Sequence, residues 1–167
     1  MRHLISVSDL KSAEIERIFA ISADLKSKQE QGLREPLLPG RVMALLFEKP
    51  SLRTRTTFEV AVRELGADTV HLSSALAEGV REPLEDIARN LERWVHALVV
   101  RTFAQDKVQR LASAAPSMPV INALTDEEHP CQALADMMTL EERLGSLKGR
   151  TLTYVGDGNN VAASLAH

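Results

Sequence analysis

The amino-acid sequence predicts an α/β fold: a βαβ domain with a parallel sheet and helices on both faces. Short apolar runs of strand length alternate with longer segments in which apolar residues recur at helical spacing. The run Val42–Phe47 is apolar throughout, which is typical of a strand buried on both faces of a parallel sheet. Strands joined by helices of this length form right-handed βαβ units, and therefore a largely parallel sheet.

The expected elements follow one another up to residue 145, and we assign residues 1–145 to one domain. Strands are predicted over residues 42–47, 69–72, 98–101 and 120–123. Helices are predicted after Ser12, from Ser51 to Gly66, over 84–95, over 108–115 and from Pro130. Ser51 is expected to cap its helix, because a serine side chain there can accept a hydrogen bond from a free backbone N–H group.

Residues 146–167 predict a linker and the start of a second α/β domain. A fifth strand is expected over Thr151–Val155, followed by a tight turn at Gly156–Gly158 and the first residues of a helix. A domain is not expected to end so soon after a helix begins. We therefore expect the second domain to be incomplete in this chain.

The composition excludes several classes of protein. The chain has 167 residues, of which 44% are hydrophobic and 26% charged, as in ordinary globular proteins. Its net charge of -3 argues against a nucleic-acid binder, although a local arginine cluster would still suffice for a small anion. Cys131 is the only cysteine, no apolar run is long enough to span a membrane, and the residues after Met1 form no apolar leader. We expect a cytoplasmic protein that does not bind membranes.

The strongest functional signal lies between Phe47 and Arg55, where the sequence reads FEKPSLRTR. A helix N-terminus favours an anion, and Ser51, Thr54 and an arginine would add donors and charge that suit a phosphate. Arg53 and Arg55 cannot face the same way on a helix, so we assign Arg53 to the ligand and Arg55 to a structural ion pair. A capped helix with solvated arginines fits the same residues equally well.

This segment resembles the carbamoyl-phosphate signature of the aspartate/ornithine carbamoyltransferase family, usually Ser-Thr-Arg-Thr-Arg. Leu52 replaces the first threonine, so one hydroxyl donor is lost while the backbone N–H group remains. Further segments resemble motifs of that family in the same order along the whole chain: Gly79–Glu82 with Asp86–Leu91, Val99–Phe103 and His129–Gln132.

The resemblance implies a carbamoyl-phosphate site and a role for each matching residue. Charge develops on the carbonyl oxygen during carbamoyl transfer, so donors aimed at that oxygen lower the barrier. Thr54, Arg101 and His129 are the implied catalytic donors, with His129 expected to be neutral because nearby arginines disfavour its cation. Binding of carbamoyl phosphate is implied for Ser51, Leu52, Arg53, Thr54, Arg101, His129 and Gln132.

The segment after the linker carries the specificity signal. Residues 156–160 read GDGNN, which resembles the ornithine branch of the family and implies that Asn160 binds the amino acid. The resemblance further implies conversion of L-ornithine to L-citrulline in arginine metabolism, a homotrimer with sites between subunits, and neither metal nor organic cofactor. Many members carry a glutamine that reaches a neighbouring subunit's site; Ser73–Ala77 lacks it, and Arg81 is the candidate to take part of that role.

Two alternatives remain open at this point. The first is another transcarbamylase that uses aspartate, putrescine or an acetylated ornithine. The second is a carbamoyl-phosphate-binding module without catalytic activity. Three residues in or next to the His129–Gln132 segment are not assigned to the site. Cys131 is interpreted as inert packing, and Glu127 and Glu128 as a solvated acidic turn.

Overall fold

The computed structural model describes residues 3–79 and 81–167. Met1, Arg2 and Val80 lie outside these ranges, so the N-terminal expectation and the Gly79–Glu82 motif are described only in part. The chain forms these elements: η1 (Val7–Asp9), α1 (Ser12–Glu30), β1 (Val42–Phe47), α2 (Arg53–Glu64), β2 (Asp68–Leu72), η2 (Ser74–Glu78), α3 (Leu84–Trp94), β3 (Ala97–Arg101), α4 (Gln105–Ala114), β4 (Val120–Leu124), α5 (Pro130–Leu144) and α6 (Asn160–Ala166).

The strands form one parallel sheet in the order β2-β1-β3-β4. Each of the four predicted strands is present, with bounds that differ from the expected ones by one residue at most. The two central strands, β1 and β3, carry the buried apolar runs, since each has a neighbouring strand on both sides. The predicted fold class is confirmed.

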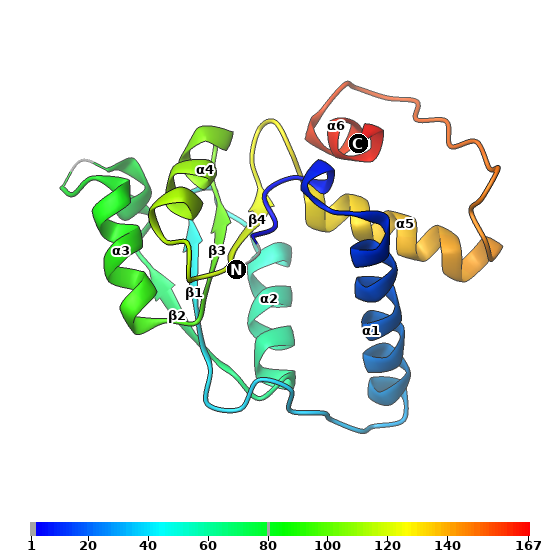
Figure 1. Ribbon diagram of the computed structural model, residues 1–167, viewed down its shortest axis with the longest axis horizontal. Helices are drawn as coiled ribbons and strands as arrows, with labels where there is room; N and C mark the ends of the chain where they lie inside the picture. The colour runs from blue at the N-terminus through cyan, green and yellow to red at the C-terminus, as the bar shows by residue number, and fades with distance from the viewer. Residues whose placement is uncertain (1–2, 80) are drawn as a thin grey trace.

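Helices cover both faces of the sheet (Figure 1). On one face α3 and α4 enclose the larger core, in which Leu46, Leu98 and Val100 of the sheet join Leu91 and Leu111 of the helices. On the other face lie α2 and α5, over a smaller cluster of Leu45, Val99 and Ala123. This alternation follows from the strands themselves, because successive side chains point to opposite faces.

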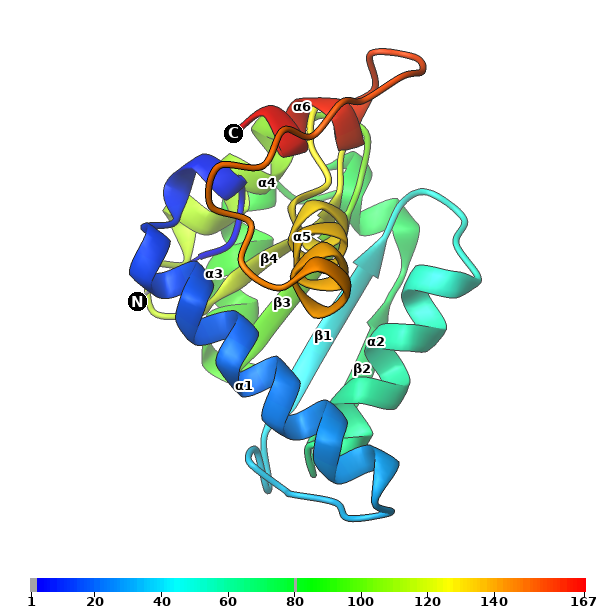
Figure 2. The ribbon, with the colours of Figure 1, turned by 90° about the vertical axis from the view of Figure 1, so that its right-hand side faces the viewer.

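The N-terminal segment crosses the second face as an outer layer. Figure 2 shows α1 running in front of the sheet beside α5, and α1 has no buried residue. Before it, Leu4 forms an isolated parallel bridge with Ile121, which extends the β4 edge of the sheet. No helix in the described ranges combines the length and apolar character needed to cross a bilayer.

The fifth strand expected at Thr151–Val155 is wrong. Residues 151–159 form neither strand nor helix, and Val155 is 90% exposed. A strand needs a neighbouring backbone to satisfy its N–H and C=O groups, and no described strand lies beside these residues. The helix expected after the turn is present as α6, which packs against α5 and η1. The domain boundary near residue 145 stays a prediction.

Candidate functional site

The carboxyl ends of β3 and β4 and the loop that follows β1 border a cavity of about 730 Å³. Ligands of open α/β sheets bind outside this edge of the sheet. The cavity is lined by Pro50, Ser51, Leu52, Arg53, Thr54, Thr57, Phe58, Arg101, Leu124, His129, Cys131 and Gln132. All seven residues predicted to bind carbamoyl phosphate are among them, and none of the lining residues is a carboxylate.

The first turn of α2 presents backbone donors at the cavity. The helix begins at Arg53, and its first backbone hydrogen bond runs from the N–H of Thr56 to the carbonyl of Leu52 at 3.0 Å. The prediction that Ser51 caps the helix is wrong, because Leu52 already has helical dihedral angles and no side chain caps this end. The early N–H groups of α2 are therefore left for a ligand.

The two arginines of this turn face apart, as predicted. Arg53 lines the cavity and forms no ion pair within the described part of the chain. Arg55 points away and pairs with Glu59 at 3.3 Å, one turn along the same helix. Of these two arginines, only Arg53 can therefore meet an anion in the cavity.

Arg101 brings a second positive charge from the end of β3. Its Nη1 donates to the hydroxyl of Thr54 at 3.2 Å, while its Nε is buried without a partner. Burial lowers the pKa of Arg101, although a guanidinium remains charged at any working pH. An unpaired donor on a buried cation favours an anionic or carbonyl oxygen beside it.

His129 approaches from the N-terminus of α5. Its backbone N–H donates to the hydroxyl of Ser164 at 2.9 Å, and its Nδ1 is buried without a partner. Burial first and the positive charge of Arg101 second lower the pKa of His129, opposed by Asp136. The neutral imidazole is therefore favoured, and it can act as a hydrogen-bond donor without adding charge.

Gln132 and Cys131 line the cavity, whereas Asn160 does not. Gln132 lines it, while its amide donates to Asp136 at 2.8 Å. Cys131 lines it as well, but burial raises the pKa of its thiol to about 12, so it is an unreactive packing group. Asn160 is not among the lining residues; its amide nitrogen donates to the carbonyl of Thr125 at 2.6 Å.

Polar contacts that the sequence did not reveal brace the loops behind this site. The carboxylate of Glu48 accepts hydrogen bonds from Thr102 and, at 2.9 Å, from Lys107. Burial raises the pKa of Glu48, but the bonds from Lys107 and Thr102 outweigh it, so the pKa lies below its ordinary value. Lys49 pairs with Asp126 and lies 4.5 Å from the ring centre of Phe103. Glu48 and Lys49 lie in the FEKPSLRTR segment, which was the one available signal.

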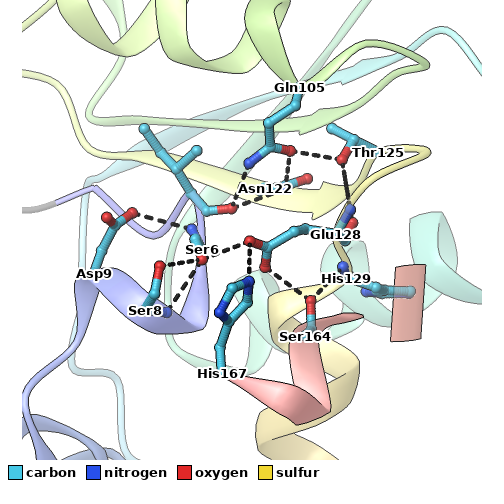
Figure 3. Close-up of polar contacts among 11 residues, drawn as sticks. Ser6, Ser8, Asp9, Gln105, Asn122, Thr125, Glu128, His129, Ser164 and His167 are labelled. Atoms are coloured by element: carbon cyan, nitrogen blue, oxygen red, sulfur yellow. Dashed lines mark hydrogen bonds and ion pairs between the residues drawn. The ribbon is translucent and has the colours of Figure 1, made fainter. Parts of the chain in front are cut away.

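Only one of the two glutamates before His129 is solvated. Glu127 is exposed, as predicted, whereas Glu128 is 8% exposed, so the interpretation of Glu128 as part of a solvated turn is wrong. Figure 3 shows its carboxylate among side chains from the N-terminal segment and α6. These contacts are distant in sequence, so no local pattern indicated them.

Together these groups form a concentrated electropositive site. The N-terminus of α2, Arg53 and Arg101 supply positive potential, and the lining carries no negative side chain to offset it. Hydroxyl donors come from Ser51 and Thr54. Such an arrangement suits a small ligand that combines a phosphate with a carbonyl group.

Comparison with known proteins identifies relatives along the whole chain. Residues 2–142 match the family described as aspartate/ornithine carbamoyltransferase, carbamoyl-P binding domain. An ornithine carbamoyltransferase of Parafrankia sp. is 50% identical over 167 residues, which cover 98% of this chain and 52% of the relative. The chain therefore spans about half the length of the curated relatives it matches.

Solved structures agree with this match. The ornithine carbamoyltransferase from Pyrococcus furiosus superposes with a TM-score of 0.93 at 44% identity, covering 98% of this chain and 52% of that chain. An aspartate transcarbamoylase from Trypanosoma cruzi superposes with a TM-score of 0.89 at 30% identity, covering 99% of this chain and 52% of that chain. From the matched family and these similarities, we conclude that the chain belongs to the aspartate/ornithine carbamoyltransferase family and contains its carbamoyl-phosphate-binding domain.

Proposed function

We propose that this chain supplies the carbamoyl-phosphate site of an ornithine carbamoyltransferase, which transfers the carbamoyl group to L-ornithine and releases L-citrulline and phosphate. One observation carries the proposal. Arg101 and His129, each with a buried side-chain nitrogen that lacks a protein partner, line the same carboxylate-free cavity as the uncapped start of α2. Buried polar atoms without partners are rare unless a ligand or solvent satisfies them.

The phosphate group of the substrate fits the N-terminal turn of α2. There it meets backbone N–H groups, the hydroxyl of Ser51 and the guanidinium of Arg53, which together neutralise a dianion. Leu52 contributes its backbone N–H group alone. As the bond between the carbonyl carbon and the phosphate oxygen breaks, Arg53 stabilises the charge on the leaving phosphate.

The carbonyl oxygen of the substrate fits beside the residues that end β3 and begin α5. Thr54, Arg101 and His129 are the donors assigned to it, and they act more strongly as the amine attacks and negative charge develops. Gln132, which lies one helical turn from His129, is assigned to the carbamoyl amine. The attacking nitrogen forms the new bond to carbon and loses a proton, while the phosphate leaves with the electron pair.

The amino-acid side of the reaction rests on less of the chain. Asn160 is the residue assigned to the α-amino and carboxylate groups of ornithine, by its place in the GDGNN segment. The curated relatives are about twice as long as the matched segment, so we assign most of the ornithine site to a portion equivalent to their second half. A homotrimer, a cytoplasmic location and a role in arginine metabolism belong to the same proposal.

The likeness to an aspartate transcarbamoylase shows that the fold of this domain is shared by enzymes that are named for different amino acids. The choice of ornithine therefore depends on the GDGNN segment and on the ornithine carbamoyltransferases among the relatives.

Calorimetric titration with carbamoyl phosphate tests the assigned site. Arg53→Ala should weaken binding by roughly tenfold to a hundredfold, because a hydrogen bond to a charged group contributes about 1.5–3 kcal/mol. Arg55→Ala is the matched control, since it removes the same charge two positions away on the opposite side of α2, and it should leave the affinity nearly unchanged. Equal losses in both variants would mean that general electrostatic attraction, rather than this site, holds the ligand.

A further inference from the structure

The carboxylate of Glu128 joins three segments that are far apart in the sequence (Figure 3). The hydroxyl of Ser6 donates to its Oε1 at 2.6 Å, and the hydroxyl of Ser164 on α6 donates to its Oε2 at 2.9 Å. The imidazole Nε2 of His167 lies 3.3 Å from Oε1. Both serines are buried, with exposed fractions of 8% for Ser6 and 1% for Ser164.

The hydroxyl of Ser164 also hydrogen-bonds the backbone of His129. A backbone N–H group can only donate, so the bond from the His129 N–H group makes the Ser164 oxygen an acceptor. The single proton of that hydroxyl is then free to point at Glu128, 2.9 Å away. Glu128 therefore orients Ser164, and Ser164 in turn holds the backbone of the residue whose imidazole lines the cavity.

The same turn of the chain also holds the first residue of α6. The amide of Asn160 donates to the carbonyl of Thr125. Thr125 and Glu128 are directly hydrogen-bonded, since the N–H of Thr125 donates to the carbonyl of Glu128 at 2.8 Å and the N–H of Glu128 donates to the hydroxyl of Thr125 at 3.0 Å. Asn160 and Ser164 lie about one turn apart on α6 and are therefore seated by the same short segment.

We propose that Glu128 is a positioning residue that sets His129, on the carbamoyl side, and Asn160, on the amino-acid side, relative to each other. The proposal rests on the proposed function. Besides its packing against α5 and η1, α6 is held by these polar contacts, and residues 151–159, which lead into it, are exposed and irregular. Removal of the carboxylate should release α6 and loosen the backbone at His129 without altering the phosphate-binding turn of α2.

Hydrogen exchange in this chain tests the contact directly. In Glu128→Ala, the amides of His129 and of residues 160–166 should exchange about tenfold faster or more, the effect expected when one buried hydrogen bond of about 1.4 kcal/mol is lost. Glu127→Ala is the matched control, because it removes the neighbouring exposed carboxylate and should change nothing. Glu128→Gln keeps one acceptor oxygen and should fall between the wild type and Glu128→Ala. Equal exchange in Glu127→Ala and Glu128→Ala would overturn the proposal.

Ser164→Ala provides a second variant should Glu128→Ala fail to fold. It keeps the bond between Ser6 and Glu128, but removes the acceptor of the His129 N–H group. Exchange at His129 should rise in this variant as well, while exchange in α2 stays unchanged. Unchanged exchange at His129 would overturn the proposal.

Kinetics in an enzyme of the relatives' length that carries this segment separates positioning from a structural role. Ser164→Ala and Glu128→Ala should lower kcat and raise the KM for L-ornithine, about tenfold in kcat/KM for the loss of one such bond, while the dissociation constant of carbamoyl phosphate changes little. A lower melting temperature with unchanged kinetics would make the contact merely structural and overturn the proposal. Absence of citrulline formation by the unsubstituted enzyme would instead overturn the proposed function, and the exchange result would still decide whether the contact holds His129 and α6.

Discussion

Two segments that were predicted as strands differ in structure in this chain. β3, Ala97–Arg101, lies between β1 and β4, and its first four residues are buried. Residues 151–155 have a similar strand-like composition, yet all five are exposed and irregular. β3 places Arg101 at the cavity with a defined hydrogen bond to Thr54. The second segment leads to Asn160, which is seated by a few polar contacts around Glu128 and Thr125.

The difference teaches that strand propensity becomes structure only where neighbouring strands satisfy the backbone. The same difference explains why the two sides of the proposed site are not equally well ordered by this chain. The carbamoyl-phosphate side is organised by the sheet within this chain, whereas the amino-acid side depends on α6 and on what packs around residues 151–159.

The largest expected effect concerns catalysis by the chain alone. Carbamoyl phosphate should bind, but citrulline should not form at a rate near that of a full-length ornithine carbamoyltransferase. Positioning of two reactants contributes about 7–11 kcal/mol to barrier lowering, and Asn160 is the one residue of this chain that we propose for the amino-acid side. A citrulline assay on the purified chain measures this, and turnover at the full-length rate would show that this chain holds both sides of the site.

The next effect compares how much the two segments predicted as strands contribute to stability. Leu98→Ala, at a position that is 0% exposed in β3, should lower the free energy of unfolding by about 2–5 kcal/mol. Leu152→Ala, at a position that is 51% exposed, should change it by no more than about 0.5 kcal/mol. Urea unfolding followed by circular dichroism measures both. A large loss for Leu152→Ala would show that residues 151–155 are packed in solution.

A smaller effect arises from the titration of His129, whose folded-state pKa is lowered by burial and by Arg101. The folded state binds this proton less readily than the unfolded state does, so stability should fall as the pH drops below about 6.5 and level off below the folded pKa. One group contributes a slope of at most about 1.4 kcal/mol per pH unit.

Urea unfolding at several pH values should show that His129→Asn removes part of this slope. His3 is the control, because burial lowers its pKa too, and His3→Asn should remove a separate part of the same sign. An NMR titration that placed the His129 pKa above the ordinary value would contradict the neutral donor role.

The smallest effect concerns the second arginine of α2. Arg55→Ala should lower the free energy of unfolding by only about 0.3–0.5 kcal/mol, because its ion pair with Glu59 is a solvent-exposed contact within one helix. Thermal unfolding at low and high salt measures it, and the difference from the wild type should shrink as salt screens the pair. A loss of several kcal/mol would mean that Arg55 has a buried partner in solution.

The sequence by itself determined the strands of the sheet, the order of the elements along the chain and the segment that we propose to bind phosphate. Buried strands such as Val42–Phe47 and amphipathic helices such as α3 are specified by residues close together in the chain, so periodicity predicts them. The facing of Arg53 and Arg55 follows from helical geometry alone. The assignment of Arg101 and His129 to one site needed the family's motifs, because neither residue is unusual in isolation.

Only the tertiary structure decided how these pieces are held. The burial of Glu128 depends on Ser6 and Ser164, which are 122 and 36 residues away in the sequence. The bond between Glu48 and Thr102, 54 residues apart, likewise joins two strand ends that only the parallel sheet brings together. Residues 151–155 lack such neighbours and stay irregular. In each case the environment of a side chain or strand depends on parts of the chain that are distant in sequence, so the local sequence does not predict it.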